Sequence, residues 1–327
     1  MPEVEPKKTV YLFGAGATHA ELQNLDPDLK EENGLLIGNV SSRVIEKARR
    51  DEKYLEDIAM VSGTFGSLNI ELLISLIENS KIHDWDSKTR RLKTLVQEDI
   101  VDILSKSRPA RFYLHKALFE LHTHPNIKTK EELIGLISLN YDDVLDRAYE
   151  KFLGAPNYCF CLGDTPSSEL IPLLKLHGSF NWKRRKIRGR WRRIEIIPLG
   201  AAKSYLHAPY GFIWNRALEI LIRCDKLRVI GCSMSPNDAH LIDLLFKAHL
   251  EKGKAFDIEI ISSTGAGEEI QKNYGFFRGI KTLVNIENLV PDPNPDNPFQ
   301  TWLKYKTIQM LGEPAIDKTR YLKRVVR

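Results

Sequence analysis

The amino-acid sequence predicts an α/β fold in which a Rossmann-like, doubly wound parallel sheet carries an inserted helical layer. Short apolar runs alternate with helical stretches along most of the chain, a glycine-rich turn follows the first apolar run, and a long helical region separates the first run from the second. Alternation of this kind is typical of parallel sheets with helices on both faces.

Five apolar runs are the expected strands. The first, residues 9–13, is β-branched and aromatic and leads straight into a glycine turn, as in the first βα unit of such a sheet. The other four are too short for helices and lack strict alternation, which favours strands buried on both faces. They cover residues 133–139, 173–176, 227–230 and 258–261.

Helical stretches fill the intervals, over residues 144–152, 210–222 and 239–252. Between about residues 41 and 125, apolar residues recur every three or four positions, which predicts a helical insertion into a domain spanning residues 1–290. Four prolines lie within residues 291–298, so residues 291–327 are expected to form an extended linker and a short C-terminal helix or tail.

The composition is that of a globular protein and excludes several classes. The chain is 43% hydrophobic and 28% charged, which argues against disorder. No apolar run approaches the roughly 20 residues that span a bilayer, and the N-terminus lacks the apolar centre of a secretory signal, so we expect a cytoplasmic protein. The four cysteines are too few and too irregular for a disulfide framework or paired zinc knuckles, so we expect reduced thiols and no metal site.

A basic segment covers residues 183–193, with eight positive charges and no negative ones, although the whole chain carries a formal net charge of only +5. Bulky residues on both sides of Gly189 predict a β-hairpin over about residues 182–194. Such a run can bind nucleic acid phosphates, but it is more often a solvated or protein-docking face. We therefore favour a protein partner over nucleic acid.

Polar residues follow all five expected strands. Because the C-terminal ends of parallel strands share one edge, these segments are expected to converge on one ligand site. The first, Gly14-Ala15-Gly16-Ala17-Thr18, allows close backbone approach and can place amides and a helix N-terminus against a pyrophosphate. It lacks both the third glycine of the dinucleotide fingerprint and the ending of a P-loop. The others cover residues 140–143, 177–179, 231–233 and 262–264.

Two of these residues have the chemistry of a catalytic pair, and each also has a simpler interpretation. Asn140 precedes a predicted helix, where it or the nearby Asp142 or Asp143 suits an N-cap. His177 suits a general base because imidazole titrates near neutrality, and it equally suits a hydrogen-bonded buried histidine. A serine hydrolase is disfavoured, because the candidate nucleophile turn around Ser233 lacks the second glycine of G-x-S-x-G.

The order and spacing of four motifs resemble the sirtuin superfamily over about residues 9–265. The motifs are Gly14-Ala15-Gly16-Ala17-Thr18, Leu139-Asn140-Tyr141-Asp142, Leu176-His177-Gly178-Ser179 and Val229-Ile230-Gly231-Cys232-Ser233. The resemblance is closest to the sirtuin-like NADase branch of bacterial antiphage systems, which Asn69-Ile70-Glu71-Leu72-Leu73 also resembles. It implies NAD as substrate, with Asn140 and His177 as the catalytic pair.

Two departures bear on the activity that the resemblance implies. Deacylating sirtuins carry a zinc module with paired C-x-x-C motifs after the catalytic histidine, where this chain has the cysteine-free residues 183–193. The glycine-proline-aspartate-phenylalanine-arginine loop is also missing. Water is therefore the favoured acceptor, with nicotinamide and ADP-ribose as products. Protein deacylation, or a catalytically silent NAD- or ADP-ribose-binding subunit of a defence complex, are the alternatives.

The resemblance also implies roles for the remaining strand-end residues and for partners. Gly14, Ala15, Gly16, Ala17 and Thr18 would hold the diphosphate, and Asp142 would contact the ribose or cap its helix. The adenosine side would be lined by Gly231, Ser233, Ser262 and Ser263. Relatives of this size assemble as homo-oligomeric rings or with a separately encoded HerA-type motor ATPase, and an antiviral role that depletes NAD is expected.

Overall fold

The computed structural model of the chain describes a six-stranded parallel sheet in the order β3-β2-β1-β6-β7-β8. The described residues are 5–25, 34–65, 69–81, 84–107, 112–123, 131–161, 170–182, 185–187, 190–192, 208–234, 238–253, 257–262, 264–275, 281–284, 289–290, 293–294 and 296–311. The strands are β1 (Lys7–Phe13), β2 (Glu131–Ser138), β3 (Leu173–Lys175), β6 (Lys226–Ile230), β7 (Asp257–Ile261) and β8 (Lys281–Leu283).

All five predicted strands are present, and every pairing in this sheet is parallel. The doubly wound α/β class is therefore confirmed. The sequence did not predict β8, which pairs with β7 at the edge of the sheet. Its three residues are too few to give a recognisable apolar period.

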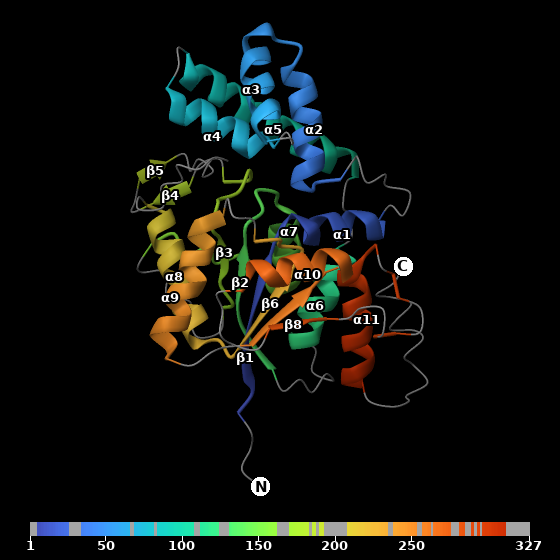
Figure 1. The fold of residues 1–327 in the computed structure, drawn as a ribbon. Helices are drawn as coiled ribbons and strands as arrows, with labels where there is room; N and C mark the ends of the chain where they lie inside the picture. Colours follow the sequence, from blue (N-terminus) through green and yellow to red (C-terminus); the bar gives the residue numbers. More distant parts are fainter. Residues whose placement is uncertain are drawn as a thin grey trace.

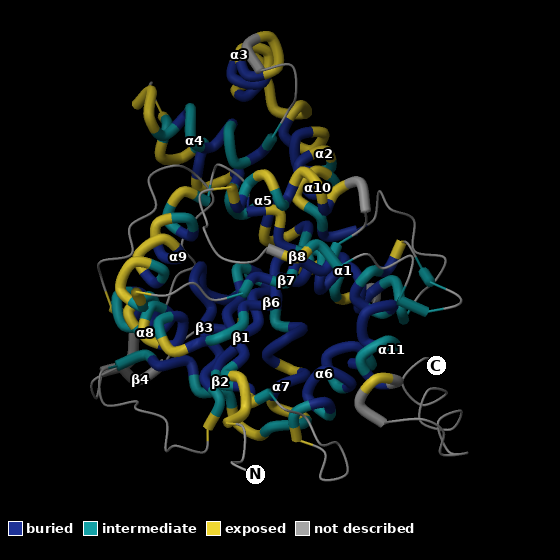
Figure 2. Tube along the Cα trace, turned by 60° about the horizontal axis from the view of Figure 1, so that its bottom comes forward, coloured by how far each residue is buried: buried dark blue, intermediate teal, exposed yellow. Residues whose placement is uncertain are grey.

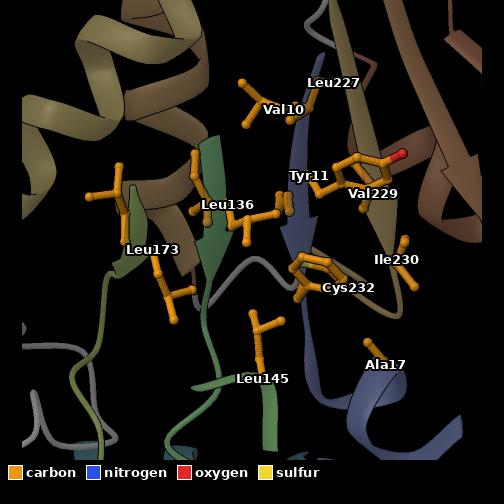
Figure 3. Packing of buried hydrophobic residues seen from close by; sticks show 14 of the residues in the cluster. Val10, Tyr11, Ala17, Leu136, Leu145, Leu173, Leu227, Val229, Ile230 and Cys232 are labelled. Carbon is orange, nitrogen blue, oxygen red and sulfur yellow. The ribbon is translucent and has the colours of Figure 1, made fainter. Parts of the chain in front are cut away.

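The core of the molecule lies around the central strand β1. The five residues from Thr9 to Phe13 are buried because β1 has a strand on each side and helices on each face. Figure 3 shows this packing, with Leu173, Leu136 and Val10 reaching across neighbouring strands toward Leu227. The strands are thus apolar on both faces, as the absence of alternation predicted.

Among the described residues, seven helices pack against or beside the sheet (Figure 1). α8 contacts β1, β2 and β3 and packs against α9, whereas α11 contacts β7, α1 and α6. The remaining two, α7 and α10, follow β2 and β7 along the chain. Their bounds are α1 (Ala15–Leu25), α6 (Tyr113–Thr123), α7 (Val144–Leu153), α8 (Tyr210–Arg223), α9 (Ala239–Lys252), α10 (Thr264–Asn273) and α11 (Pro298–Leu311).

The inserted helical layer has a hydrophobic core of its own. It consists of α2 (Ile37–Ala48), the short 3₁₀ helix η2 (Glu52–Tyr54), α3 (Leu55–Phe65), α4 (Ile70–Ser80) and α5 (Trp85–Ser107). Figure 1 shows the layer above the edge where the strands end, and Figure 2 shows its buried inner side and exposed outer side. The layer therefore covers the edge of the sheet at which the sequence places the ligand site.

Two helices differ in place from the sequence-based expectation. α6 was grouped with the helical insertion, but Leu114 and Leu118 bury their side chains in the core of the sheet. α11 was expected to follow a linker as a terminal appendage, but Phe299 and Trp302 are buried in that same core. Periodicity identifies an apolar helix face without identifying the surface that the face covers.

The predicted basic hairpin is present as two antiparallel strands, β4 (Arg185–Ile187) and β5 (Arg190–Arg192). Ile187 pairs with Arg190, and residues 188 and 189 between them lie outside the described residues. The hairpin begins three residues after Trp182, which is buried.

Candidate functional site

A cavity of about 1050 Å³ lies at the C-terminal edge of the sheet, beneath the helical layer. This volume is at the upper end for a small-molecule site. Five strand-end segments reach the cavity, as predicted. The predicted site residues that line it are Gly14, Ala15, Gly16, Asn140, Asp142, His177, Gly231, Ser233 and Ser262.

Three predicted residues are not among those that line the cavity. Ala17 and Thr18 are buried behind the first glycine turn, and Ser263 lies outside the described residues. Thr18 nevertheless bears on the site, because its hydroxyl contacts two residues that do line the cavity.

The glycines of the first turn are required by close packing against the turn after β6. A β-carbon on Gly14 would lie 2.4 Å from the carbonyl oxygen of Gly231, and one on Gly16 would lie 2.8 Å from the Gly231 Cα. A β-carbon on Gly231 would lie 2.2 Å from the amide nitrogen of Ala17, and the φ of Gly231 is +60°. Contact between two backbones therefore explains all three glycines.

This packing also limits how the turn can bind an anion. The amides of Gly14, Gly16 and Ala17 donate to backbone carbonyls at 3.0 Å each. At most, the amide of Ala15, which lines the cavity, is available to a phosphate, together with the positive end of the α1 dipole. The turn is a narrower anion site than the five-residue motif suggests.

Asn140 is held by its side chain across the sheet rather than used as a helix cap. Its Nδ2 donates to the carbonyl oxygen of Gly14 at 2.9 Å and to Oγ1 of Thr18 at 3.0 Å. These bonds fix the amide against the glycine turn, although 126 and 122 residues separate the partners in sequence. Only 9% of Asn140 is exposed, and it lines the cavity.

Asp142 lies one residue before the N-cap position of α7, which is Asp143 and makes no side-chain capping bond. Oδ1 of Asp142 accepts from the amide of Val144 at the start of α7, and its Oδ2 accepts from Thr18 Oγ1, each at 3.0 Å. Burial raises the pKa of this carboxyl, while Lys175, Val144 and Thr18 act in the opposite direction. Because both oxygens accept hydrogen bonds within the chain, Asp142 positions Thr18 and through it Asn140.

His177 lies on a tight turn directly after β3. The amide of Gly178 donates to the carbonyl of Lys175 at 3.1 Å, and the φ of Gly178 is +85°, a conformation that favours glycine. The imidazole stacks on Tyr141 at a centroid distance of 5.9 Å, and Phe180 stacks on Tyr141 at 5.6 Å. His177 is 6% exposed and lines the cavity.

A fully buried lysine joins the two turns that carry Asn140 and His177. Lys175, the last residue of β3, donates from Nζ to the backbone carbonyl of Asp142, to Oδ2 of Asp146 at 2.6 Å and to Oγ of Ser179 at 2.7 Å. Asp146 also accepts from the Tyr158 hydroxyl at 2.6 Å. The sequence analysis did not identify Lys175, because its partners lie up to 33 residues away.

The turns after β6 and β7 form another wall of the cavity, with Gly231, Ser233 and Ser262 among its lining. Cys232 lines the same wall, and burial raises the pKa of its thiol to about 12. The sulfur is therefore protonated at neutral pH and does not serve as a thiolate nucleophile.

Further cavity residues come from elements to which the sequence gave no binding role. One set lies on the helical layer and includes Asn69 and Glu71, whose only sequence signal is the motif over residues 69–73. A second set lies on α1 and on residues 294–300, where the sequence gave no signal beyond the prolines. Together these two sets form the roof and one side of the cavity.

Two searches of the described residues for other features gave negative results. No helix there is both long and apolar enough to cross a membrane. No three side chains of His, Cys, Asp or Glu gather there as metal ligands.

Comparison with known proteins finds Sir2 structures. No model of a known family matches the chain, and no curated protein matches its sequence. Sir2Tm bound to a propionylated peptide shares 14% identity, covering 85% of this chain and 87% of that chain, with a TM-score of 0.39. A Sir2 homologue in complex with NAD shares 16% identity, covering 83% and 90%, with a TM-score of 0.38. Similarity this low does not determine ligand or activity.

Proposed function

We propose that this chain is an NAD⁺ hydrolase that cleaves the nicotinamide–ribose bond to give nicotinamide and ADP-ribose. The observation that carries the proposal is the convergence of Asn140, His177 and the glycine turn on one cavity at the C-terminal edge of the sheet. The resemblance of these motifs to sirtuin-like NADases supports the choice of substrate.

Loss of nicotinamide leaves positive charge on the ribose, so the reaction requires an oriented sugar and water more than a strong nucleophile. The amide of Asn140 is held in one orientation by Gly14 and Thr18, which suits it to position the nicotinamide ribose and the attacking water. His177, which lines the same cavity, accepts the proton from water as the new C–O bond forms. Nicotinamide leaves with the electron pair of the broken C–N bond.

The other walls of the cavity bind different parts of the dinucleotide in this proposal. The amide of Ala15 and the N-terminus of α1 face the diphosphate, and the turns after β6 and β7 face the adenosine. Water is the acceptor in this proposal because residues 183–193, which follow the His177 turn, have no cysteine with which to build a zinc module.

The biological setting that we propose is antiphage defence, in which the enzyme depletes cellular NAD. In that setting the chain works as a homo-oligomer or with a separately encoded HerA-type motor ATPase. The basic hairpin of β4 and β5 suits such a protein partner, because its charges are gathered on one short antiparallel element.

The test is chromatographic measurement of NAD loss and of product identity, without added peptide and with and without the partner ATPase. We expect nicotinamide and ADP-ribose from the native protein, and a loss of about 10²–10⁴-fold in rate for Asn140→Asp and His177→Gln. His249→Ala is the matched control, because His249 lies near the C-terminal end of α9 and is not among the lining residues.

Two other results would overturn the proposal and assign another function. Turnover that requires an acylated peptide would assign protein deacylation. NAD binding without turnover under any condition would assign a binding subunit. Thermal unfolding of each variant should accompany the rates, because Asn140 also contributes two buried hydrogen bonds.

A further inference from the structure

We propose that Gln23 and Asn24, at the C-terminal end of α1, recognise the edge of the adenine base and make the enzyme selective for adenine dinucleotides. This inference rests on the proposed function, because it assigns a base-reading site within the same cavity. Both residues line that cavity, and the glycine motif before them gave no reason to expect a role for either.

The first observation is a pair of buried polar atoms with no hydrogen-bond partner. Within the described part of the chain, neither Oε1 of Gln23 nor Nδ2 of Asn24 has one. Leaving a buried polar group without a partner costs about 1–3 kcal/mol, so proteins rarely do so. One atom accepts and the other donates, and both residues line the cavity.

The second observation is that the Asn24 amide is held in a defined orientation. Its Oδ1 accepts from Nε2 of Gln300 at 2.6 Å, which turns Nδ2 away from Gln300. Gln300 is fixed in turn, because its Oε1 accepts from Nδ2 of Asn294 at 3.3 Å. The backbone amide of Asn294 donates to Oγ1 of Thr301 at 2.9 Å. The start of α11 therefore holds the donor in place before any ligand binds.

The third observation is position along the sheet. α1 begins at the end of β1 and runs toward α11, as Figure 1 shows, whereas Asn140 and His177 follow β2 and β3 on the other side of β1. α11 packs on both α1 and β7. Gln23 and Asn24 line the cavity together with Ala266 and Ile270 of α10, the helix after β7, which offer apolar surface to a ring.

The chemistry of adenine fits this pair. Adenine presents an N6 amino donor beside a ring-nitrogen acceptor, and Asn and Gln amides recognise that pattern with one acceptor and one donor. Here Gln23 Oε1 would accept from N6 and Asn24 Nδ2 would donate to the ring nitrogen. Hypoxanthine carries an oxygen at position 6, which would oppose the Gln23 oxygen with a second acceptor.

The experiment compares nicotinamide release from NAD⁺ and from nicotinamide hypoxanthine dinucleotide. We expect the native enzyme to favour NAD⁺ by at least about tenfold in kcat/KM. Gln23→Met and Asn24→Leu keep the side-chain volume. The first removes the proposed acceptor for N6, and the second removes the proposed donor to the ring nitrogen. Both variants should bring the ratio toward one through KM, with kcat nearly unchanged because the reacting ribose is bound elsewhere.

Gln309→Met is the matched control, because Gln309 is exposed on α11 and outside the cavity lining. If the native enzyme hydrolyses both dinucleotides equally, or if both variants keep the native ratio, the base-reading role is overturned while the hydrolase remains. If no dinucleotide is hydrolysed, the proposed function fails instead, and calorimetric binding of the two dinucleotides still tests the base-reading role.

Discussion

Two fully buried cations lie on the same sheet. Their surroundings differ, because one contacts the turns that carry cavity residues and the other contacts only strands and helices of the core. Lys175 ends β3 and binds the turns that carry Asn140 and His177. Arg228 lies in the middle of β6 and binds the carboxylates of Glu259 on the neighbouring strand β7 and of Glu131 on β2, which lies beyond β1. Each is at most 1% exposed, so burial alone does not distinguish them.

The partners of Arg228 belong to regular structure. Its guanidinium donates to both oxygens of Glu131 on β2 and to Glu259 on β7, and it lies 5.3 Å from the ring centroid of Trp302 on α11. Its hydrogen bonds tie β6 to strands on both sides. The network holds the sheet together at a distance from the residues that line the cavity.

The partners of Lys175 are mostly outside the strands. Its ammonium group binds a carbonyl in the turn before α7, a carboxylate within α7 and a hydroxyl in the turn after β3. These contacts fix the distance between the turn that carries Asn140 and the turn that carries His177. The buried ion pair of Lys175 and Asp146 therefore positions cavity residues, whereas that of Arg228 does not. The comparison teaches that the partners of a buried charge, rather than its burial, indicate a role in function.

The largest expected effect comes from removing each cation. Lys175→Met and Arg228→Met should each lower the free energy of unfolding by about 3–5 kcal/mol. Lys175→Met leaves the buried Asp146 without a cation, and Arg228→Met leaves the partly buried Glu131 and Glu259 with Lys226 alone. Turnover of NAD per folded molecule should fall more than tenfold in Lys175→Met and stay near native in Arg228→Met. Urea unfolding gives the stability, and rates should be measured under conditions in which both variants are folded.

A double variant sharpens the distinction. Lys175→Met with Asp146→Asn removes the unpaired charge and keeps an acceptor for the Tyr158 hydroxyl. Stability should recover in part, but turnover should not, because the link between the two turns stays broken. Equal losses of turnover in Lys175→Met and Arg228→Met would show that both networks act only through stability.

The next largest effect is expected from the glycine turns that line the cavity. Gly231→Ala should cost more than about 2 kcal/mol of stability and abolish NAD binding, because the added carbon meets the Ala17 amide at 2.2 Å in a left-handed backbone. Gly253, at the end of α9, has a similar φ of +68° and no atom within 4 Å of an added carbon. Gly253→Ala should therefore cost only about 1 kcal/mol and leave binding intact. Equal losses in calorimetric binding would remove the packing argument.

Local patterns were sufficient to predict most of the fold and the convergence of the strand ends. The short apolar runs identified five strands, and parallel topology placed Asn140 and His177 on one edge. The placement of α11 could not be predicted, since Trp302 contacts a core that is distant in sequence.

The contacts that shape the site were beyond sequence reasoning for the same reason. Lys175 looked like an ordinary strand residue until its three acceptors were known. The glycines were correctly placed, but as anion ligands rather than as the contact between two backbones. Gln23 and Asn24 carry no motif, because their interest lies in atoms that the rest of the chain leaves without a partner.

The smallest expected effect is a pH dependence of the unfolding free energy, which arises from His122 near Arg228. The Arg228 guanidinium donates to the Tyr11 oxygen at 2.9 Å, which directs the Tyr11 hydroxyl toward Nε2 of His122 at 2.8 Å. Burial, together with Arg228, lowers the pKa of His122 from 6.5 to about 4, although Glu131 opposes the shift. The imidazole is thus held neutral as an acceptor.

Because the pKa of His122 is lower in the folded chain, the unfolded chain binds its proton more readily. The stabilisation is therefore complete above about pH 6.5 and is lost as the pH falls toward 4, by about 1–3 kcal/mol. His122→Gln keeps an acceptor for Tyr11 and removes the titration, so its unfolding free energy should vary less over this interval. NAD turnover per folded molecule should be the same in both proteins, because Arg228, Tyr11 and His122 are not among the residues that line the cavity. An unchanged pH slope in His122→Gln would assign the acid sensitivity to other groups, and lost turnover would show that the two ends of the sheet are coupled.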